Sequence, residues 1–220
     1  MDINAPKVLG FVIQLAVLLF AVSFHESAHA LAALRLGDTT ARDLGRISLN
    51  PLRHIDPFGS VLLPILLYFT SGLIFGYAKP TPVDLRNTRN PRFADFVVSA
   101  AGPISNFLLA MVAVVALFGL SRLRVGASAG ESVIAPLWEV ARTFLIVNLS
   151  LALFNLIPIP PLDGSGVLAS VLGGGARRAF NSLAPFGFLI LILLSSTGAL
   201  GRLLGPVFRF FLDLVSRMLQ

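Results

Sequence analysis

The sequence places two histidines and a glutamate inside a long apolar segment. Residues 8–36 are almost entirely apolar, yet they contain His25-Glu26-Ser27-Ala28-His29, which has the spacing H-E-x-x-H. A helix over this segment would be roughly 43 Å long at about 1.5 Å per residue, which is enough to cross a bilayer with tilt. A charged side chain at the centre of a spanning helix costs about 2.5–3.5 kcal/mol on insertion scales. We therefore expect a compensating partner, and a bound metal ion would be one.

The spacing of the two histidines favours a shared ion. Residues four apart lie on the same face of a helix, so His25 and His29 can bind one metal while Glu26 reaches a water molecule beside it. A catalytic zinc site has this division of roles, with a further ligand from elsewhere, an open position for water and a carboxylate base. The alternative is that both histidines only pack inside a helix bundle, where these polar groups would still need partners.

A third ligand has to come from another segment, and Asp163 is the strongest candidate. It is the only charged residue in 143–176, and it follows the proline-rich bend 158–161. Irregular backbone of this kind is tolerated at membrane depth only where protein or water covers it. The alternative is a simple helix-terminating Asp-Gly turn. His54 and Asp56 are competing ligands, but they lie among arginines in a polar loop and rank lower.

The composition indicates an integral membrane protein. Of 220 residues, 55% are hydrophobic and 13% charged, whereas a soluble domain carries about 25% charged residues. The net charge of +6 predicts contact with membrane lipid and no nucleic acid, because the basic residues lie in short loops beside apolar segments. Cysteine is absent, which excludes disulfides and thiolate metal ligands.

The apolar pattern predicts an all-α polytopic membrane protein that forms a single domain over residues 1–220. We expect a catalytic core over about 8–172 and C-terminal helices over 185–219, the second of which is charged enough to lie partly in the membrane interface. Short strands are expected near residues 45–50. About five to six apolar helical segments are predicted, over residues 8–36, 58–76, 94–120, 133–157, 185–197 and 200–219.

The order of these segments makes 58–76 a poor candidate for a full crossing. For Asp163 to meet the histidines, the 133–157 segment must run in the same direction as the first one. Two full crossings between them would reverse it. Residues 58–76 are short, broken by Pro64 and Gly72, and flanked by basic loops on both sides, so we expect a re-entrant or broken hairpin.

The same basic loops predict the orientation of the chain. Lysine and arginine are concentrated in residues 37–57 and 77–93. Such loops stay on the cytoplasmic side of a membrane. We therefore expect a multi-pass protein of the cell membrane, with its N-terminus outside and a site that opens toward the cytoplasm.

Several motifs occur in an order that is typical of one family. H-E-x-x-H in the first apolar segment is followed, in a later one, by N-x-x-P-x-x-x-x-D-G, formed by Asn155, Pro158, Asp163 and Gly164. Between them lie Gly45-Arg46-Ile47-Ser48-Leu49-Asn50-Pro51-Leu52-Arg53-His54-Ile55-Asp56-Pro57 and Ala101-Gly102-Pro103-Ile104-Ser105-Asn106. The chain thus resembles the site-2 protease family of intramembrane zinc metalloproteases from about residue 20 to 165. The stretch of residues 45–57 is similar to the short bacterial branch of that family, which has no PDZ domain.

The resemblance implies one Zn²⁺ per chain, held by His25, His29 and Asp163, with Glu26 as the catalytic base. It implies hydrolysis of peptide bonds in or near a transmembrane helix of a protein or peptide substrate. Asn155 would bind the unwound substrate or stabilise the oxyanion, or it would instead form a helix–helix hydrogen bond.

The remaining motif residues have less specific roles. Gly102, Pro103 and Asn106 are expected to be structural, and His54 structural or gating. Two other functions stay open. One is a metal-binding transporter, which would not need Glu26 and would be expected to show inverted repeats, which the sequence lacks. The other is a non-proteolytic membrane chaperone. Nothing in the sequence predicts the oligomeric state or the identity of the substrate.

Overall fold

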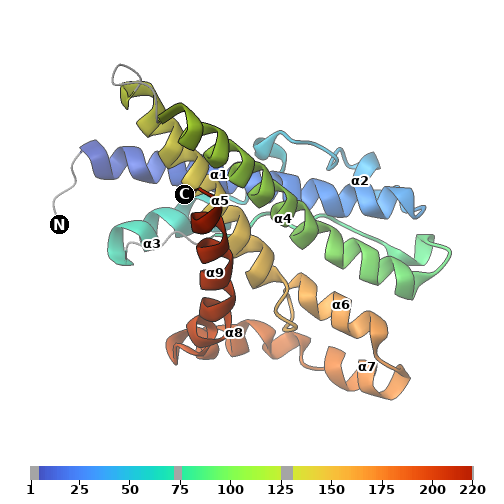
Figure 1. The fold of residues 1–220 in the computed structure, drawn as a ribbon. Helices are drawn as coiled ribbons and strands as arrows, with labels where there is room; N and C mark the ends of the chain where they lie inside the picture. The colour runs from blue at the N-terminus through green and yellow to red at the C-terminus, as the bar shows by residue number, and fades with distance from the viewer. Residues whose placement is uncertain (1–4, 72–75, 125–130, 220) are drawn as a thin grey trace.

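Three long helices form the centre of the molecule (Figure 1): α1 (Ala5–Arg35), α4 (Pro91–Arg124) and α5 (Glu131–Asn155). The computed structural model describes residues 5–71, 76–124 and 131–219, and these residues are helical or irregular, without a strand. The three helices and the stretch Gly174–Ser196 are long and apolar enough to cross a membrane. The prediction of an all-α polytopic membrane protein is therefore confirmed.

Shorter helices connect the long ones and follow them. The C-terminal pair, α8 (Gly187–Ser196) and α9 (Ala199–Met218), confirms the two helices predicted over residues 185–219, and α9 is not among the candidate membrane spans. The shorter elements are α2 (Thr40–Asp43), η1 (Pro51–Arg53), the π-helical turn η2 (Pro57–Leu62), α3 (Leu63–Ser71), η3 (Leu85–Asn87), α6 (Asp163–Val171), α7 (Gly174–Asn181), η4 (Ala184–Phe186), α8 (Gly187–Ser196) and α9 (Ala199–Met218).

Small side chains allow the three long helices to pack closely. One buried cluster joins Val17, Leu18 and Ala21 of α1 to Val147 of α5, and another joins α4 to α5 through Ala110, Ala113, Leu117, Leu145 and Leu149. Alanine at such contacts lets helix backbones approach each other, as in membrane bundles. Only 33% of the most apolar window of α1 and 22% of that of α4 is buried. The remaining apolar surface faces outward, as a lipid-facing surface does.

Helices α1 and α5 run in the same direction, and α4 runs against both. Phe20 of α1 lies beside Phe144 of α5, with ring centroids 5.8 Å apart. Five residues further along α1, His25 meets Asp163, which lies beyond the end of α5. Among the described residues, α4 is the one helix of membrane-spanning length between α1 and α5. This is the arrangement that the order of the motifs predicted.

The segment between the two basic loops forms a hairpin that returns to its own start. Its helical part, Pro57–Thr70, is shorter than the candidate spans. Tyr77 N donates to Gly59 O at 3.0 Å, and Ser60 Oγ donates to Tyr77 O at 2.8 Å. Entry and exit therefore lie side by side, as expected for a re-entrant segment, while residues 72–75 of the predicted range lie outside the described residues.

The prediction of short strands near residues 45–50 is wrong. This stretch is irregular, and Gly45 has a left-handed φ of +66°. Side chains take up its carbonyl groups: Arg53 donates to Gly45 O at 2.9 Å, and His54 donates to Ser48 O at 2.7 Å. These contacts replace the backbone ladder that a strand requires.

Both basic loops lie at the same end of the bundle. Asp38, just after α1, accepts a hydrogen bond from Asp84 N at 2.7 Å. Lys79 N donates to His54 O at 2.9 Å. The loops before and after the hairpin are thus joined at two points, which agrees with the expectation that they share one side of a membrane.

Candidate metal centre

Three side chains from distant parts of the chain converge between α1, α4 and the start of α6. His25 Nε2 lies 3.0 Å from Asp163 Oδ2, and His29 Nε2 lies 3.4 Å from Asp163 Oδ1. Both histidines are more than nine-tenths buried. Within the described part of the chain, this is the one group of three His, Cys, Asp or Glu residues whose ligand atoms come within 4.8 Å of one another. The structure thus brings together the three residues that the sequence suggested as ligands.

The outer nitrogen of each imidazole is already engaged. His29 Nδ1 lies 2.6 Å from Val98 O of α4, and His25 Nδ1 lies 2.6 Å from Asn106 Oδ1. A carbonyl oxygen only accepts, so Nδ1 carries the proton in both rings. Each Nε2 therefore presents a lone pair toward Asp163, which is the tautomer that a metal ligand needs.

Two buried asparagines fix the orientation of the amide at His25. Asn148 Nδ2 donates to Phe144 O at 2.9 Å, so its oxygen faces Asn106. Asn106 Nδ2 donates to that oxygen at 2.9 Å and to Ala21 O at 3.2 Å. The Asn106 oxygen is then left for His25. Both asparagines have an exposed fraction of 0%.

Sequence reasoning assigned Asn106 a structural role and missed Asn148. The structure links Asn106 directly to a candidate metal ligand and links Asn148 to it through Asn106. The signal for Asn148 was present, because an amide in the middle of an apolar segment needs a buried partner. Its partner lies 42 residues away, on another helix.

The three facing groups are all hydrogen-bond acceptors. Asp163 Oδ2 is buried and has no hydrogen-bond donor among the described residues. A carboxylate and two lone pairs at this distance repel one another unless a cation lies between them. Two nitrogens and a carboxylate oxygen are ligands that zinc accepts, so the residues present fit that ion.

Glycines allow the close approach of these groups. A Cβ atom at Gly102 of α4 would collide with His29 Nε2 and press against His25 Nε2, so the absence of a side chain keeps the space between the ligands open. Pro103 is buried beside it, and α4 continues through this proline. A Cβ at Gly164 would collide with Leu156 O at the end of α5. The bend therefore packs directly on the first turn of α6, where Asp163 lies.

The helix that begins with Asp163 is anchored to α4 at two further points. A Cβ at Gly166 would collide with Ser99 Oγ, so α6 packs closely against the side chains of α4. Farther along, Arg177 of α7 pairs with Asp95 of α4 at 2.6 Å. These contacts hold the start of α6 against the helix that also carries Gly102.

Glu26 lies on α1 between the two histidines but outside the ligand group. Its side chain is half-buried, and Oε2 accepts a hydrogen bond from Thr81 N at 2.7 Å. The contact with Thr81 was not anticipated from the sequence. A carboxylate beside the ligands but not among them has the position that a general base needs.

Asn155, predicted to act on the substrate or between helices, donates from Nδ2 to Leu151 O in its own helix at 3.0 Å. No contact given by the described residues joins it to the three ligands or to another helix. Both roles suggested for Asn155 stay predictions.

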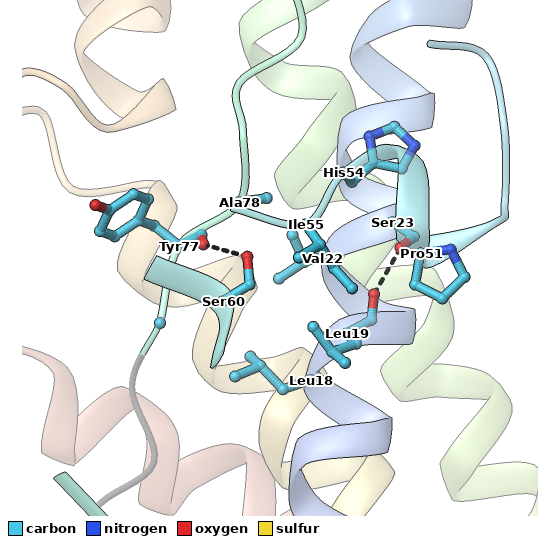
Figure 2. A pocket seen from close by; sticks show the side chains of 11 residues that line it. Leu18, Leu19, Val22, Ser23, Pro51, His54, Ile55, Ser60, Tyr77 and Ala78 are labelled. Carbon is cyan, nitrogen blue, oxygen red and sulfur yellow. Dashed lines mark hydrogen bonds between the residues drawn. The ribbon is translucent and has the colours of Figure 1, made fainter. Parts of the chain in front are cut away.

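The competing ligands His54 and Asp56 are engaged elsewhere. His54 has an exposed fraction of 2%, donates from Nε2 to Ser48 O, and lines a cavity of about 10 Å³ between α1 and the hairpin (Figure 2). Such a volume is about that of one water molecule. Asp56 accepts from Phe58 N and Gly59 N at the start of η2. Neither residue belongs to the metal-binding group.

Comparison with known proteins agrees with this site. The model of the family described as Peptidase family M50 matches residues 13–133 and 121–194, so the match extends well past Asp163. The chain is 35% identical to the protein named "Putative zinc metalloprotease YwhC" of Bacillus subtilis over 86% of this chain and 83% of that protein.

Two mycobacterial proteins give a similar result. The chain is 32% identical to the protein of Mycolicibacterium smegmatis named "Putative zinc metalloprotease Rip2", over 92% of this chain and 74% of that one. It is 30% identical to the protein of the same name from Mycobacterium tuberculosis H37Rv, over 91% and 73%. No solved structure matches. With its two motifs meeting in one buried site and a family match over most of its length, the chain belongs to peptidase family M50, the site-2 proteases.

Proposed function

We propose that this membrane zinc metalloprotease hydrolyses peptide bonds in or near the transmembrane helices of other membrane proteins. The observation that carries the proposal is the convergence of His25, His29 and Asp163, inside a bundle of membrane-length helices, with Glu26 beside them. The names of the relatives from Bacillus and the mycobacteria support the same chemistry.

The chain's own residues divide the work between binding and proton transfer. Zinc held by His25, His29 and Asp163 would supply Lewis acidity and lower the pKa of water at the site. Glu26 takes a proton from that water and delivers it to the leaving amine. With Glu26 Oε2 bonded to Thr81 N, its other oxygen remains for this transfer.

A transmembrane substrate fits the surroundings of the site. The two histidine ligands lie in the second half of α1, and α1 exposes apolar side chains near them, such as Phe20 and Leu31. A substrate helix can approach from the lipid and unwind where the irregular loops around residues 45–57 and 77–84 meet α1. Irregular backbone at this depth is tolerated because protein covers it.

The single-domain organisation and the orientation are part of the proposal. Ile157 and Leu162 of the bend before Asp163 share a buried cluster with Leu191 of α8, against which Leu200 and Leu204 of α9 pack. This supports one domain that includes the C-terminal helices. The two basic loops at one end of the bundle support a site that opens toward the cytoplasm, with the N-terminus outside.

The test is a comparison of wild type with Glu26→Gln. We expect both proteins to bind one zinc per chain, measured by mass spectrometry of the purified protein in detergent. The Glu26→Gln variant should retain transmembrane fragments during purification, and wild type should cleave peptides made from them, while the variant is at least about a thousandfold slower, within the range seen for catalytic groups that act as a unit. Glu139→Gln, an exposed carboxylate on α5, is the matched control and should behave as wild type.

Any other result would contradict one element of the proposed function. Full activity of Glu26→Gln would exclude Glu26 as the base. A wild-type protein without zinc would exclude the metal site. Zinc binding with no cleavage of any captured peptide would favour the transporter or the chaperone, and only the transporter would carry radioactive zinc into sealed vesicles.

A further inference from the structure

The chain that leaves the hairpin crosses α1 beside Glu26. Residues 77–82, which we call the strap, are irregular and have no helical hydrogen bonds of their own. Hydrogen bonds to other segments hold them instead, and every second residue donates one from its backbone N–H. These are Tyr77 N to Gly59 O at 3.0 Å, Lys79 N to His54 O at 2.9 Å and Thr81 N to Glu26 Oε2 at 2.7 Å.

The sequence of the strap leaves a single donor at Glu26. Proline has no N–H, so in residues 80–82 only Thr81 can donate from its backbone. Each residue before a proline is restricted to extended conformations, which keeps Thr81 out of a helix. Its N–H is directed at the Glu26 carboxylate, and its Oγ1 donates to the Glu26 backbone carbonyl at 3.1 Å. Thr81 thus contacts Glu26 twice.

The start of the strap is packed tightly enough to serve as a fixed support. A Cβ at Gly59 would collide with the ring of Tyr77, and a Cβ at Gly76 would press against Gly59 O. Ser60 Oγ adds a bond to Tyr77 O at 2.8 Å. The strap therefore reaches Glu26 from a rigid base.

A glutamate needs such a support. Its side chain has three rotatable bonds, and α1 itself supplies no donor to its carboxylate among the described contacts. An N–H bond of 2.7 Å to an ionised oxygen is of the short, charge-assisted kind. This bond holds one oxygen of the Glu26 carboxylate and leaves the other oxygen available for proton transfer.

We propose that Thr81 is a positioning residue for catalysis, which holds Glu26 in its working orientation through the strap. The proposal rests on the proposed role of Glu26 as the base. It assigns a catalytic contribution to a loop residue that is neither a metal ligand nor part of the H-E-x-x-H motif.

The experiment compares Thr81→Pro, which removes the N–H, with Thr81→Ala, which removes only the hydroxyl, and with Thr81→Ser, which keeps both. Hydrogen bonds to charged groups contribute enough for a roughly ten- to hundredfold effect. We expect Thr81→Pro to lower kcat by that factor and Thr81→Ala to lower it by about two- to fivefold. Thr81→Ser should keep kcat within about twofold of wild type. KM and zinc content should not change.

Val83→Pro is the matched control, because the Val83 N–H donates to none of the described residues. It should keep wild-type kcat. A Thr81→Pro variant that is folded, zinc-loaded and as fast as wild type would overturn the proposal, as would an equal loss in Val83→Pro or a loss that appears in KM alone. If Thr81→Pro does not accumulate, wild-type kcat in Thr81→Ala overturns it.

The failure of this proposal and that of the proposed function can be told apart. If Glu26→Gln is inactive while Thr81→Pro is as active as wild type, Glu26 keeps its role and only the role of Thr81 is excluded. If Glu26→Gln is active, the role of Glu26 itself is excluded.

Discussion

The two sides of the candidate active site are built in different ways. On the ligand side, His25, His29, Asn106 and Asn148 lie between helices, are at least nine-tenths buried, and have matched hydrogen-bond partners. On the base side, half-buried Glu26 is held by the strap, whose residues are irregular. The arrangement of the candidate ligands thus depends on helix packing, whereas the position of the proposed base depends on loop residues. Substitutions should therefore separate zinc binding from turnover.

The largest effect on the ligand side is expected for Gly102→Ala. The added methyl group would enter the space between the two Nε2 atoms and displace a ligand. We expect zinc affinity to fall by at least about a hundredfold, the upper end of the range for disturbed metal surroundings, and activity to be lost with it. A chelator competition measured on the purified protein would show this.

Gly119→Ala is the control for that prediction. It makes the same change in the same helix, at a position where a Cβ meets nothing within 4 Å. Alanine is the better helix former by about 0.8–1.0 kcal/mol, so this variant should be as stable as wild type or more so. Equal zinc affinity in both variants would mean that Gly102 does not line the metal site.

A smaller effect is expected for Asn148→Leu, because Asn148 is on the ligand side but reaches His25 only through Asn106. Without Asn148, one Asn106 N–H is unpaired and the amide can rotate to present nitrogen to His25. His25 would then need a proton on Nε2, where the metal should bind. We expect a roughly ten- to hundredfold loss of zinc affinity.

Two further variants test this explanation. Asn148→Asp keeps an acceptor for Asn106 and should lose less zinc affinity than Asn148→Leu. Asn181→Leu changes an exposed asparagine at the end of α7 and should change nothing. Equal losses in Asn148→Leu and Asn148→Asp would show that the orientation of Asn106 is not what matters.

The ligand side was far easier to predict from the sequence. His25 and His29 follow from helical spacing, and the direction of α1 relative to α5 follows from the order of the motifs. Asp163 could be chosen because it is the only charged residue in 143–176. Each of these inferences uses a feature that can be read directly from the sequence, namely helical spacing, the number of membrane crossings or the scarcity of charge in one stretch.

The base side could not be predicted in the same way. The stretch 45–50 looked like a strand, but its carbonyl groups are taken by side chains from nearby loop residues. Thr81 meets Glu26 across 55 residues, and only the folded hairpin brings them together. Asn148 on the ligand side is a related case: its place in an apolar segment shows that it needs a buried partner, but no local pattern reveals which residue of another helix is that partner.

The smallest expected effect concerns Asp38, which ties the end of α1 to the loop that follows the strap. Its buried carboxylate accepts bonds from Thr40 N, Asp84 N and Asn87 Nδ2. Burial raises the pKa of Asp38, but these bonds, those from Thr40 first, outweigh it and hold the pKa below its usual value. Stability from Asp38 is therefore fully present above the unfolded-state pKa of about 3.9 and is lost as the pH falls through the lower folded-state value.

Asp38→Asn should lower stability at pH 7 by about 1–3 kcal/mol, the cost of leaving buried donors poorly matched. Thermal unfolding in detergent between pH 7 and pH 3 would measure this, and the variant should lack the part of the acid-induced decrease that Asp38 causes in wild type. Asp43→Asn, an exposed carboxylate on α2, is the control. Because Asp38 supports the base side, kcat should fall severalfold while zinc affinity stays the same. A parallel loss of zinc affinity would show that the two sides of the site are not independent.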